Sequence, residues 1–158
     1  MKKIASFQVD HTKFWIGMYI SRIDGDVITY DVRMVKPNGR IYLNPSSLHT
    51  IEHLFATYVR NSKYSDQIIY VGPMGCRTGF YFLTRDSLPK SEAIALIRET
   101  LDFISKYEWE IPGATITECW NYLDHNLELA KKEVLPLLEK LQNYNPEMLN
   151  YERHFDKP

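Results

Sequence analysis

The first third of the chain has the hydrophobic and polar pattern of β-strands. Residues Phe14 to Ile23 are rich in aromatic and β-branched types, and Val27 to Val35 continues that character with charged residues between apolar ones. The dipeptide Asp24-Gly25 between these segments is typical of a tight hairpin turn. We therefore predict an antiparallel pair of strands at the start of the fold.

Shorter apolar runs follow in the middle of the chain. Ile41 to Leu43 is a candidate for a short strand. Further on, Gln67 to Val71 and Gly79 to Leu83 flank the turn-forming sequence Gly72 to Cys76. The pattern predicts two more strands, with Cys76 on or beside the loop between them.

Apolar residues recur at helical spacing in three segments. The first begins after Asn44-Pro45, where Asn can cap a helix and Pro suits the first helical position, and it runs to about Arg60. The second lies roughly between Ser91 and Tyr107. The third runs from Leu127 to Gln142, with Pro136 as a candidate kink or break.

Strands and helices are grouped along the chain and do not strictly alternate. Together with the hairpin, this grouping favours an α+β fold, in which helices pack on a mostly antiparallel sheet, over a doubly wound parallel sheet. A chain of 158 residues that is 44% hydrophobic can fill one core. We expect a single domain over residues 1–158.

The charge balance argues against some classes of partner. The chain has 19 Lys and Arg against 20 Asp and Glu and a pI near 6.5, so we expect neither nucleic acid nor a membrane surface as partner. No segment has the character of a signal peptide or a membrane span, which predicts a cytoplasmic protein with a small-molecule partner. In a reducing compartment, Cys76 and Cys119 are more often catalytic, metal-binding or inert than disulfide-bonded.

The sequence His49-Thr50-Ile51-Glu52-His53 lies on the first predicted helix. Two histidines four residues apart project from one helix face and can bind a single ion. Glu52 lies beside them, where a carboxylate can act as a general base without binding the metal. An open catalytic site needs a third protein ligand, and spacing alone does not choose it. The candidates for this third ligand are His11, Cys119, His125 and His154.

A set of short motifs extends over nearly the whole chain. They are Ser6-Phe7, Asp10-His11, Asp31 to Arg33, Pro37-Asn38, His49 to His53, Arg60, Pro73 to Tyr81, Glu110 to Pro112 and Cys119. In these residues, taken in order, the chain resembles the S-ribosylhomocysteine lyase family, the LuxS-type autoinducer-2 synthases. The resemblance is most specific in the helix motif, the Pro-Met-Gly-Cys turn and the distal cysteine. One departure is Trp120, because family members commonly have glycine directly after the metal-binding cysteine.

The resemblance implies roles for individual residues. As metal ligands it implies His49, His53 and Cys119, and as the acid/base pair Glu52 and Cys76. The remaining implied residues contact the substrate. They are Ser6, His11 and Arg33 at the ribosyl part, and Ala56 and Arg60 at the homocysteine end. His125 and His154 are then expected to be ordinary surface or helix-end residues.

The resemblance also implies the reaction and the assembly. S-ribosylhomocysteine is cleaved to homocysteine and 4,5-dihydroxy-2,3-pentanedione, the autoinducer-2 precursor, by carbonyl migration and β-elimination. The active sites lie at the interface of a homodimer, with the N-terminal segment supplied by the neighbouring subunit. One divalent ion is held per subunit; the resemblance favours Fe²⁺, whereas ligand softness alone suits Zn²⁺, Co²⁺ and Fe²⁺ about equally.

Two alternatives use the same helix motif. In an inverted-motif metallopeptidase, a similar His-x-x-Glu-His helix works with a distant glutamate as third ligand. In a non-catalytic domain stabilised by a metal, a fourth protein ligand closes the site. The identity and number of the ligands therefore separate the three hypotheses.

Overall fold

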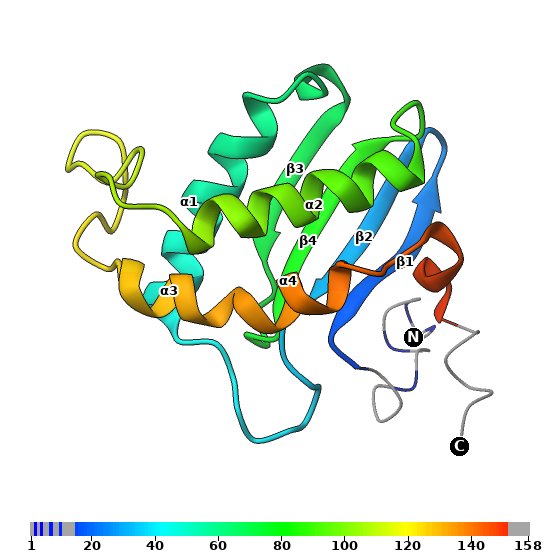
Figure 1. The fold of residues 1–158 in the computed structure, drawn as a ribbon, viewed down its shortest axis with the longest axis horizontal. Helices are drawn as coiled ribbons and strands as arrows, with labels where there is room; N and C mark the ends of the chain where they lie inside the picture. Colours follow the sequence, from blue (N-terminus) through cyan, green and yellow to red (C-terminus); the bar gives the residue numbers. More distant parts are fainter. Residues whose placement is uncertain (1, 3, 5–6, 8–9, 11–14, 152–158) are drawn as a thin grey trace.

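A four-stranded antiparallel sheet and four α-helices form the fold (Figure 1). The computed structural model describes residues 2, 4, 7, 10 and 15–151. The strands are β1 (Gly17–Asp24), β2 (Val27–Arg33), β3 (Ile68–Pro73) and β4 (Gly79–Arg85), in the order β1-β2-β4-β3. The helices are α1 (Pro45–Arg60), α2 (Lys90–Ser105), α3 (Leu127–Glu133) and α4 (Leu135–Leu141), with 3-10 turns at Ser65–Gln67 and Pro146–Leu149. The predicted α+β class with a mostly antiparallel sheet is confirmed.

The predicted hairpin is present, because β1 and β2 pair antiparallel through a turn at Gly25, whose φ of 60° suits glycine. The predicted first strand began at Phe14, which lies outside the described residues. The prediction of a strand at Ile41 to Leu43 is wrong, since these described residues form none. Leu43 instead contributes a buried side chain, and its N–H donates to Arg77 O at 2.9 Å.

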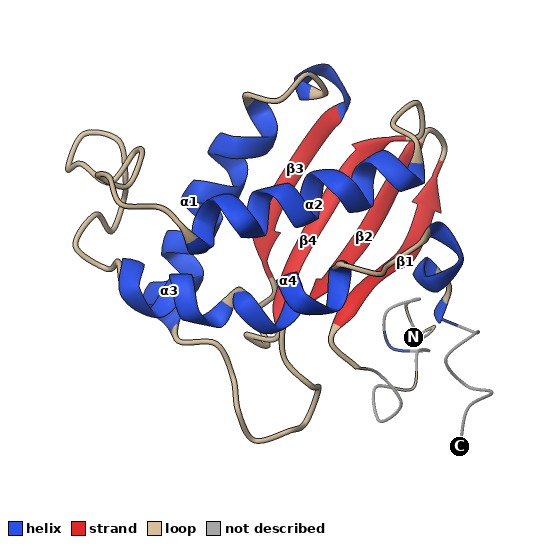
Figure 2. Cartoon of the chain, viewed as in Figure 1, coloured by secondary structure: helices blue, strands red, loops and turns tan. Residues whose placement is uncertain are grey.

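The helices cover one face of the sheet (Figure 2). Because side chains alternate along a strand, β2 and β4 direct Tyr30, Val32 and Phe82 into the core beneath the helices. Asp31 and Arg33 therefore lie on the opposite face, where both are nonetheless buried. The sheet thus places the buried Asp31–Arg33 ion pair on the face away from the helices.

The cap of α1 sets where its histidines fall. The Asn44 side chain accepts a hydrogen bond from Ser46 N at 3.0 Å, and Pro45 occupies the first turn, as the sequence predicts. The apolar side of α1 is fully buried, which fixes the helix on the sheet and leaves His49 and His53 half-buried at its border. Among the described helices, none has the length and apolar character needed to cross a membrane.

The third predicted helix is divided in two. Asn126 caps α3 by accepting from Leu129 N at 2.9 Å, and the helix ends at Glu133. Pro136 then lies in the first turn of α4, where the absence of an N–H costs no hydrogen bond. Pro136 therefore marks a break, one of the two outcomes the sequence predicts.

Candidate metal centre

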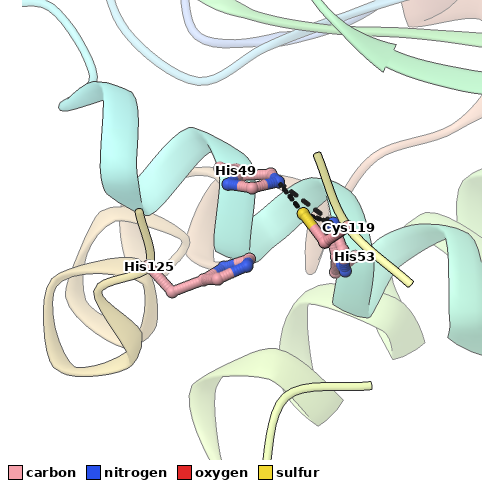
Figure 3. Close-up of side chains that lie close together, drawn as sticks. All are labelled: His49, His53, Cys119 and His125. Carbon is pink, nitrogen blue, oxygen red and sulfur yellow. Dashed lines mark hydrogen bonds between the residues drawn. The ribbon is translucent and has the colours of Figure 1, made fainter. Parts of the chain in front are cut away.

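Two imidazoles and a thiol converge at one side of α1 (Figure 3). His49 and His53 come from the helix, and Cys119 comes from the long loop between α2 and α3. The Nε2 atoms of the two histidines are 3.1 Å apart, and Cys119 Sγ lies 3.3 Å from His49 Nε2 and 3.8 Å from His53 Nε2. All three side chains are partly buried.

The backbone fixes the tautomer of both histidines. His49 Nδ1 lies 2.8 Å from Asp124 O, and His53 Nδ1 lies 2.8 Å from Pro112 O. A carbonyl oxygen only accepts, so both Nδ1 atoms carry a hydrogen, and in the neutral form that binds metals each Nε2 atom presents a bare lone pair. Two lone pairs held 3.1 Å apart repel each other unless a cation lies between them.

The distances between the donor atoms fit a single ion. Metal–nitrogen bonds near 2.0 Å and metal–sulfur bonds near 2.3 Å in a tetrahedral site place ligand atoms roughly 3.3 to 3.6 Å apart. The three observed separations, 3.1, 3.3 and 3.8 Å, lie within or close to this range. The donor set and its geometry therefore suit Zn²⁺, Co²⁺ or Fe²⁺.

The loop that carries Cys119 has its own local structure. Gly113 adopts a φ of 69°, and a Cβ there would lie 3.3 Å from His53 Nδ1, so glycine lets the loop approach the ring. Cys119 N donates to Thr115 O at 3.0 Å, and Thr115 Oγ1 donates to Glu118 Oε2 at 2.6 Å. These bonds hold the thiol beside the helix.

His125 lies at a helix end, directly before the Asn126 cap of α3, as one of the two expectations had it, but its ring also joins the cluster. Its ring stacks on that of His49, with centroids 4.1 Å apart and planes at 19°, and its Nδ1 lies 3.1 Å from Thr50 Oγ1. Burial, followed by the proximity of His49 and His53, lowers the pKa of His125 to about 4 and keeps its ring neutral at neutral pH. The feature of the sequence that could have indicated its place in the cluster is its position six residues after Cys119, near the start of a helix. His154 lies outside the described residues.

His125 is less closely placed than the other three. With Thr50 Oγ1 donating to Ser46 O, His125 Nδ1 is the donor to Thr50, and its Nε2 is buried with no partner among the described residues. All four candidate ligand atoms lie within 4.8 Å of one another, but no hydrogen bond joins His125 to the other three. The short separations therefore join three candidate ligand atoms, those of His49, His53 and Cys119, and His125 lies outside this three-ligand arrangement.

Glu52 and Ala56 share a cavity with the cluster. This cavity has a volume of about 520 Å³, and its walls include His49, Glu52, His53, Ala56, Cys119 and Trp120. Glu52 is half-buried, whereas Trp120 is fully exposed at the rim. A carboxylate thus lines the same cavity as the three closely spaced candidate ligands.

Arg33 and Cys76 lie together in a second cavity of about 720 Å³, which Phe7 also lines. Met74 to Arg77 form a tight turn in which Arg77 N donates to Met74 O at 2.9 Å, and this turn presents the exposed Cys76. A third cavity, of about 390 Å³, is lined by Glu52 and by Met74 of the same turn. Within this chain the two predicted acid/base residues therefore line neighbouring cavities.

The remaining predicted residues are placed differently. Arg60 is exposed, and its Nη2 donates to Ile69 O at 3.0 Å; it is absent from the described lining of the metal cavity. Ser6 and His11 lie outside the described residues. The structure thus brings together the predicted ligands with Glu52 and Ala56, and separately Arg33 with Cys76.

Comparison with known proteins gives one family. A model of the family "S-Ribosylhomocysteinase (LuxS)" matches residues 4–148. The chain is 43% identical to an S-ribosylhomocysteine lyase of Clostridium acetobutylicum, over 96% of this chain and 99% of the relative. It is 46% identical to an S-ribosylhomocysteine lyase of Porphyromonas gingivalis, over the same shares of the two chains. A third such lyase, of Borrelia garinii, is 44% identical, again over 96% and 99%.

The three-ligand arrangement predicts unequal effects of removing single side chains. Cys119→Ala and His53→Ala are expected to abolish tight binding of Co²⁺, because each removes a ligand. His125→Ala is expected to weaken binding only by about ten- to a hundredfold, as loss of a supporting contact does. Affinity is measured by competition with a chromophoric chelator; a loss in His125→Ala as complete as in Cys119→Ala would show a closed four-ligand site.

Proposed function

The chain belongs to the S-ribosylhomocysteinase (LuxS) family, and we propose that it is a lyase that cleaves the thioether of S-ribosylhomocysteine. The products would be homocysteine and 4,5-dihydroxy-2,3-pentanedione, which connects the enzyme to the methionine cycle and to autoinducer-2 synthesis in quorum sensing. The observation that carries the proposal is the pair of bare His49 and His53 Nε2 lone pairs beside the Cys119 thiol.

The reaction explains why a metal and two proton carriers are needed. The thioether is not activated in the substrate, so the carbonyl must first move along the ribose by two enolisations. We propose that His49, His53 and Cys119 hold one divalent ion per subunit, with Fe²⁺ as the native ion and Zn²⁺ or Co²⁺ as substitutes. When bound, this ion acts as a Lewis acid that stabilises negative charge on a substrate oxygen.

Glu52 and Cys76 are proposed as the groups that move protons. Glu52 makes no hydrogen bond to another described residue, so its carboxylate is available to a substrate in the cavity that it lines. In each enolisation one group removes a proton from carbon and a proton is delivered to the neighbouring carbon. In the final step, a base removes the proton from the carbon adjacent to the carbon that bears sulfur. The C–S bond then breaks, and its electron pair leaves with the sulfur of homocysteine.

The two separate cavities favour a homodimer with active sites at the interface. Near the Cys76 cavity the subunit exposes large apolar side chains, including Phe7 at 66%, Ile41 at 74% and Tyr42 at 40%. Exposed apolar groups of this kind are typical of interaction surfaces. We propose that a second copy covers them and completes each metal cavity with its own N-terminal segment.

Substrate contacts follow the same proposal. Ser6, His11 and Arg33 are assigned to the ribosyl part of the substrate. Ala56, in the metal cavity, and Arg60, at the end of the same helix, are assigned to the homocysteine end.

A metallopeptidase is less well supported. Its distant third ligand is a glutamate, whereas the described cluster consists of three histidines and a cysteine. A thiolate as third ligand does not separate the two hypotheses, because it suits a metal that polarises a substrate oxygen as well as one that activates water. The lyase and the peptidase differ in their substrates and in the need for Cys76, which peptidase chemistry does not use.

We expect Glu52→Gln to retain the metal and to lose turnover of S-ribosylhomocysteine by about a hundredfold or more, because it removes a base and leaves the ligands in place. Turnover is followed as free thiol with a thiol reagent, and the metal content is measured on the same sample. Glu118→Gln is the matched control, because Glu118 lines the same cavity and the glutamine Oε1 can still accept the hydrogen bond from Thr115 Oγ1. Loss of metal in Glu52→Gln would make Glu52 a ligand, and wild-type turnover would remove it from the mechanism.

A shared active site also predicts complementation between inactive subunits. Glu52→Gln and His11→Ala subunits would each be inactive as homodimers. A mixed dimer would contain one site with both changes and one intact site, so a statistical mixture should recover roughly a quarter of wild-type activity. The two subunits carry different tags, and native mass spectrometry verifies the mixed dimers; activity that stays at the level of the separate variants would contradict an interface site.

A further inference from the structure

A buried hydroxyl lies between the Arg33 guanidinium and the Cys76 thiol. Thr78 is 4% exposed and lies two residues after Cys76, directly before β4. Arg33 Nη1 donates to Thr78 Oγ1 at 2.9 Å, and the same oxygen lies 3.1 Å from Cys76 Sγ. Among the described residues, no hydrogen bond connects Arg33 directly to Cys76.

The single hydrogen of the Thr78 hydroxyl determines what this contact can do. A guanidinium only donates, so Thr78 Oγ1 accepts from Arg33 and keeps its own hydrogen for another acceptor. Two sulfur atoms are within reach, Cys76 Sγ at 3.1 Å and Met74 Sδ at 3.9 Å. When Cys76 is a thiolate, the hydroxyl donates to it; when Cys76 is a thiol, its S–H can donate to Thr78 and the hydroxyl can turn to Met74.

We propose that Thr78 is a positioning residue that transmits the charge of Arg33 to Cys76 and stabilises its thiolate through a rotating hydroxyl. The inference rests on the proposed role of Cys76 as a proton carrier. A residue that exchanges its proton in every enolisation needs a neighbour that serves both of its protonation states, and a hydroxyl does so without moving any heavy atom.

The surrounding groups keep Arg33 charged and directed at Thr78. Burial opposes the guanidinium charge, but Asp31 and Tyr151 outweigh burial and raise the pKa of Arg33. Asp31 Oδ2 accepts from Arg33 Nη2 at 3.1 Å and from Tyr151 Oη at 2.6 Å. Burial and then Asp31 raise the pKa of Tyr151, so this hydroxyl stays a donor. Nη1 of Arg33 then has its two hydrogens for Thr78 Oγ1 at 2.9 Å and for Met74 Sδ at 2.8 Å. Tyr81 and Arg77 also line the Cys76 cavity.

The backbone holds the Thr78 hydroxyl in place. Met34 N donates to Thr78 O at 2.9 Å, which connects the residue to the end of β2. The next residue, Gly79, pairs with Arg33 across the two strands, and a Cβ at Gly79 would collide with Val32 O. Glycine therefore permits the close approach of β4 to β2 that brings Thr78 to the guanidinium.

The test is the rate at which Cys76 reacts with iodoacetamide at pH 7 in the metal-loaded protein, measured by mass spectrometry of the Cys76 peptide. Thr78→Val removes the hydroxyl at nearly constant volume and is expected to slow alkylation by about tenfold, as loss of a hydrogen bond to a charged group does. Thr78→Ser keeps the hydroxyl and should react within about twofold of the wild type. Thr78→Ala provides the same deletion if the valine variant does not fold.

The outcomes separate this inference from the lyase assignment, because alkylation needs no substrate. An unchanged rate in Thr78→Val, or equal slowing in Thr78→Ser and Thr78→Val, would overturn the role of Thr78 and leave the lyase intact. Absence of thiol release from S-ribosylhomocysteine by the wild type would instead overturn the proposed function. Wild-type turnover in Cys76→Ala would exclude Cys76 as a proton carrier and would thereby also overturn the proposed role of its contact with Thr78.

Discussion

The repulsion between two imidazole lone pairs is the constraint on which the site depends. Carbonyl oxygens of Asp124 and Pro112 hold the hydrogens of His49 and His53 on Nδ1 and leave both Nε2 atoms bare at 3.1 Å. These carbonyls belong to the loop that also carries Cys119. One segment of backbone therefore selects the tautomers, orients the rings and places the thiol beside them. A divalent cation bound between the three donor atoms would relieve the repulsion that results.

The rest of the fold supplies rigid support for this constraint. Helix α1 is fixed by its buried side against the sheet, so two side chains on its border keep their separation. The opposite face of the same sheet holds Asp31 and Arg33. Asp31 accepts a hydrogen bond from Arg33, and Arg33 donates one to Thr78 beside the turn that carries Cys76. The metal donors and the proposed thiol proton carrier are thus built on different layers, and we propose that a second subunit joins the cavities into one active site.

Sequence reasoning reached the parts of the structure that depend on local patterns. The hairpin, the cap of α1 at Asn44 and the two histidines on one helix face follow from period, turn chemistry and spacing. The place of His125 could not be predicted in this way, because it depends on how a long irregular loop folds back over α1. The contact of Arg33 with Thr78 depends on strand register and on Gly79, and Ile41 to Leu43 failed as a strand because three residues with strand propensity do not guarantee a partner strand.

The central claim is an open three-ligand site, and X-ray absorption spectroscopy of the protein with one equivalent of Co²⁺ tests it most directly. The account predicts one sulfur neighbour at roughly 2.3 Å, two imidazoles and one light atom. Addition of S-ribosylhomocysteine should change only the light-atom signal. A third imidazole in the coordination sphere, with a spectrum that does not respond to the substrate, would contradict the account.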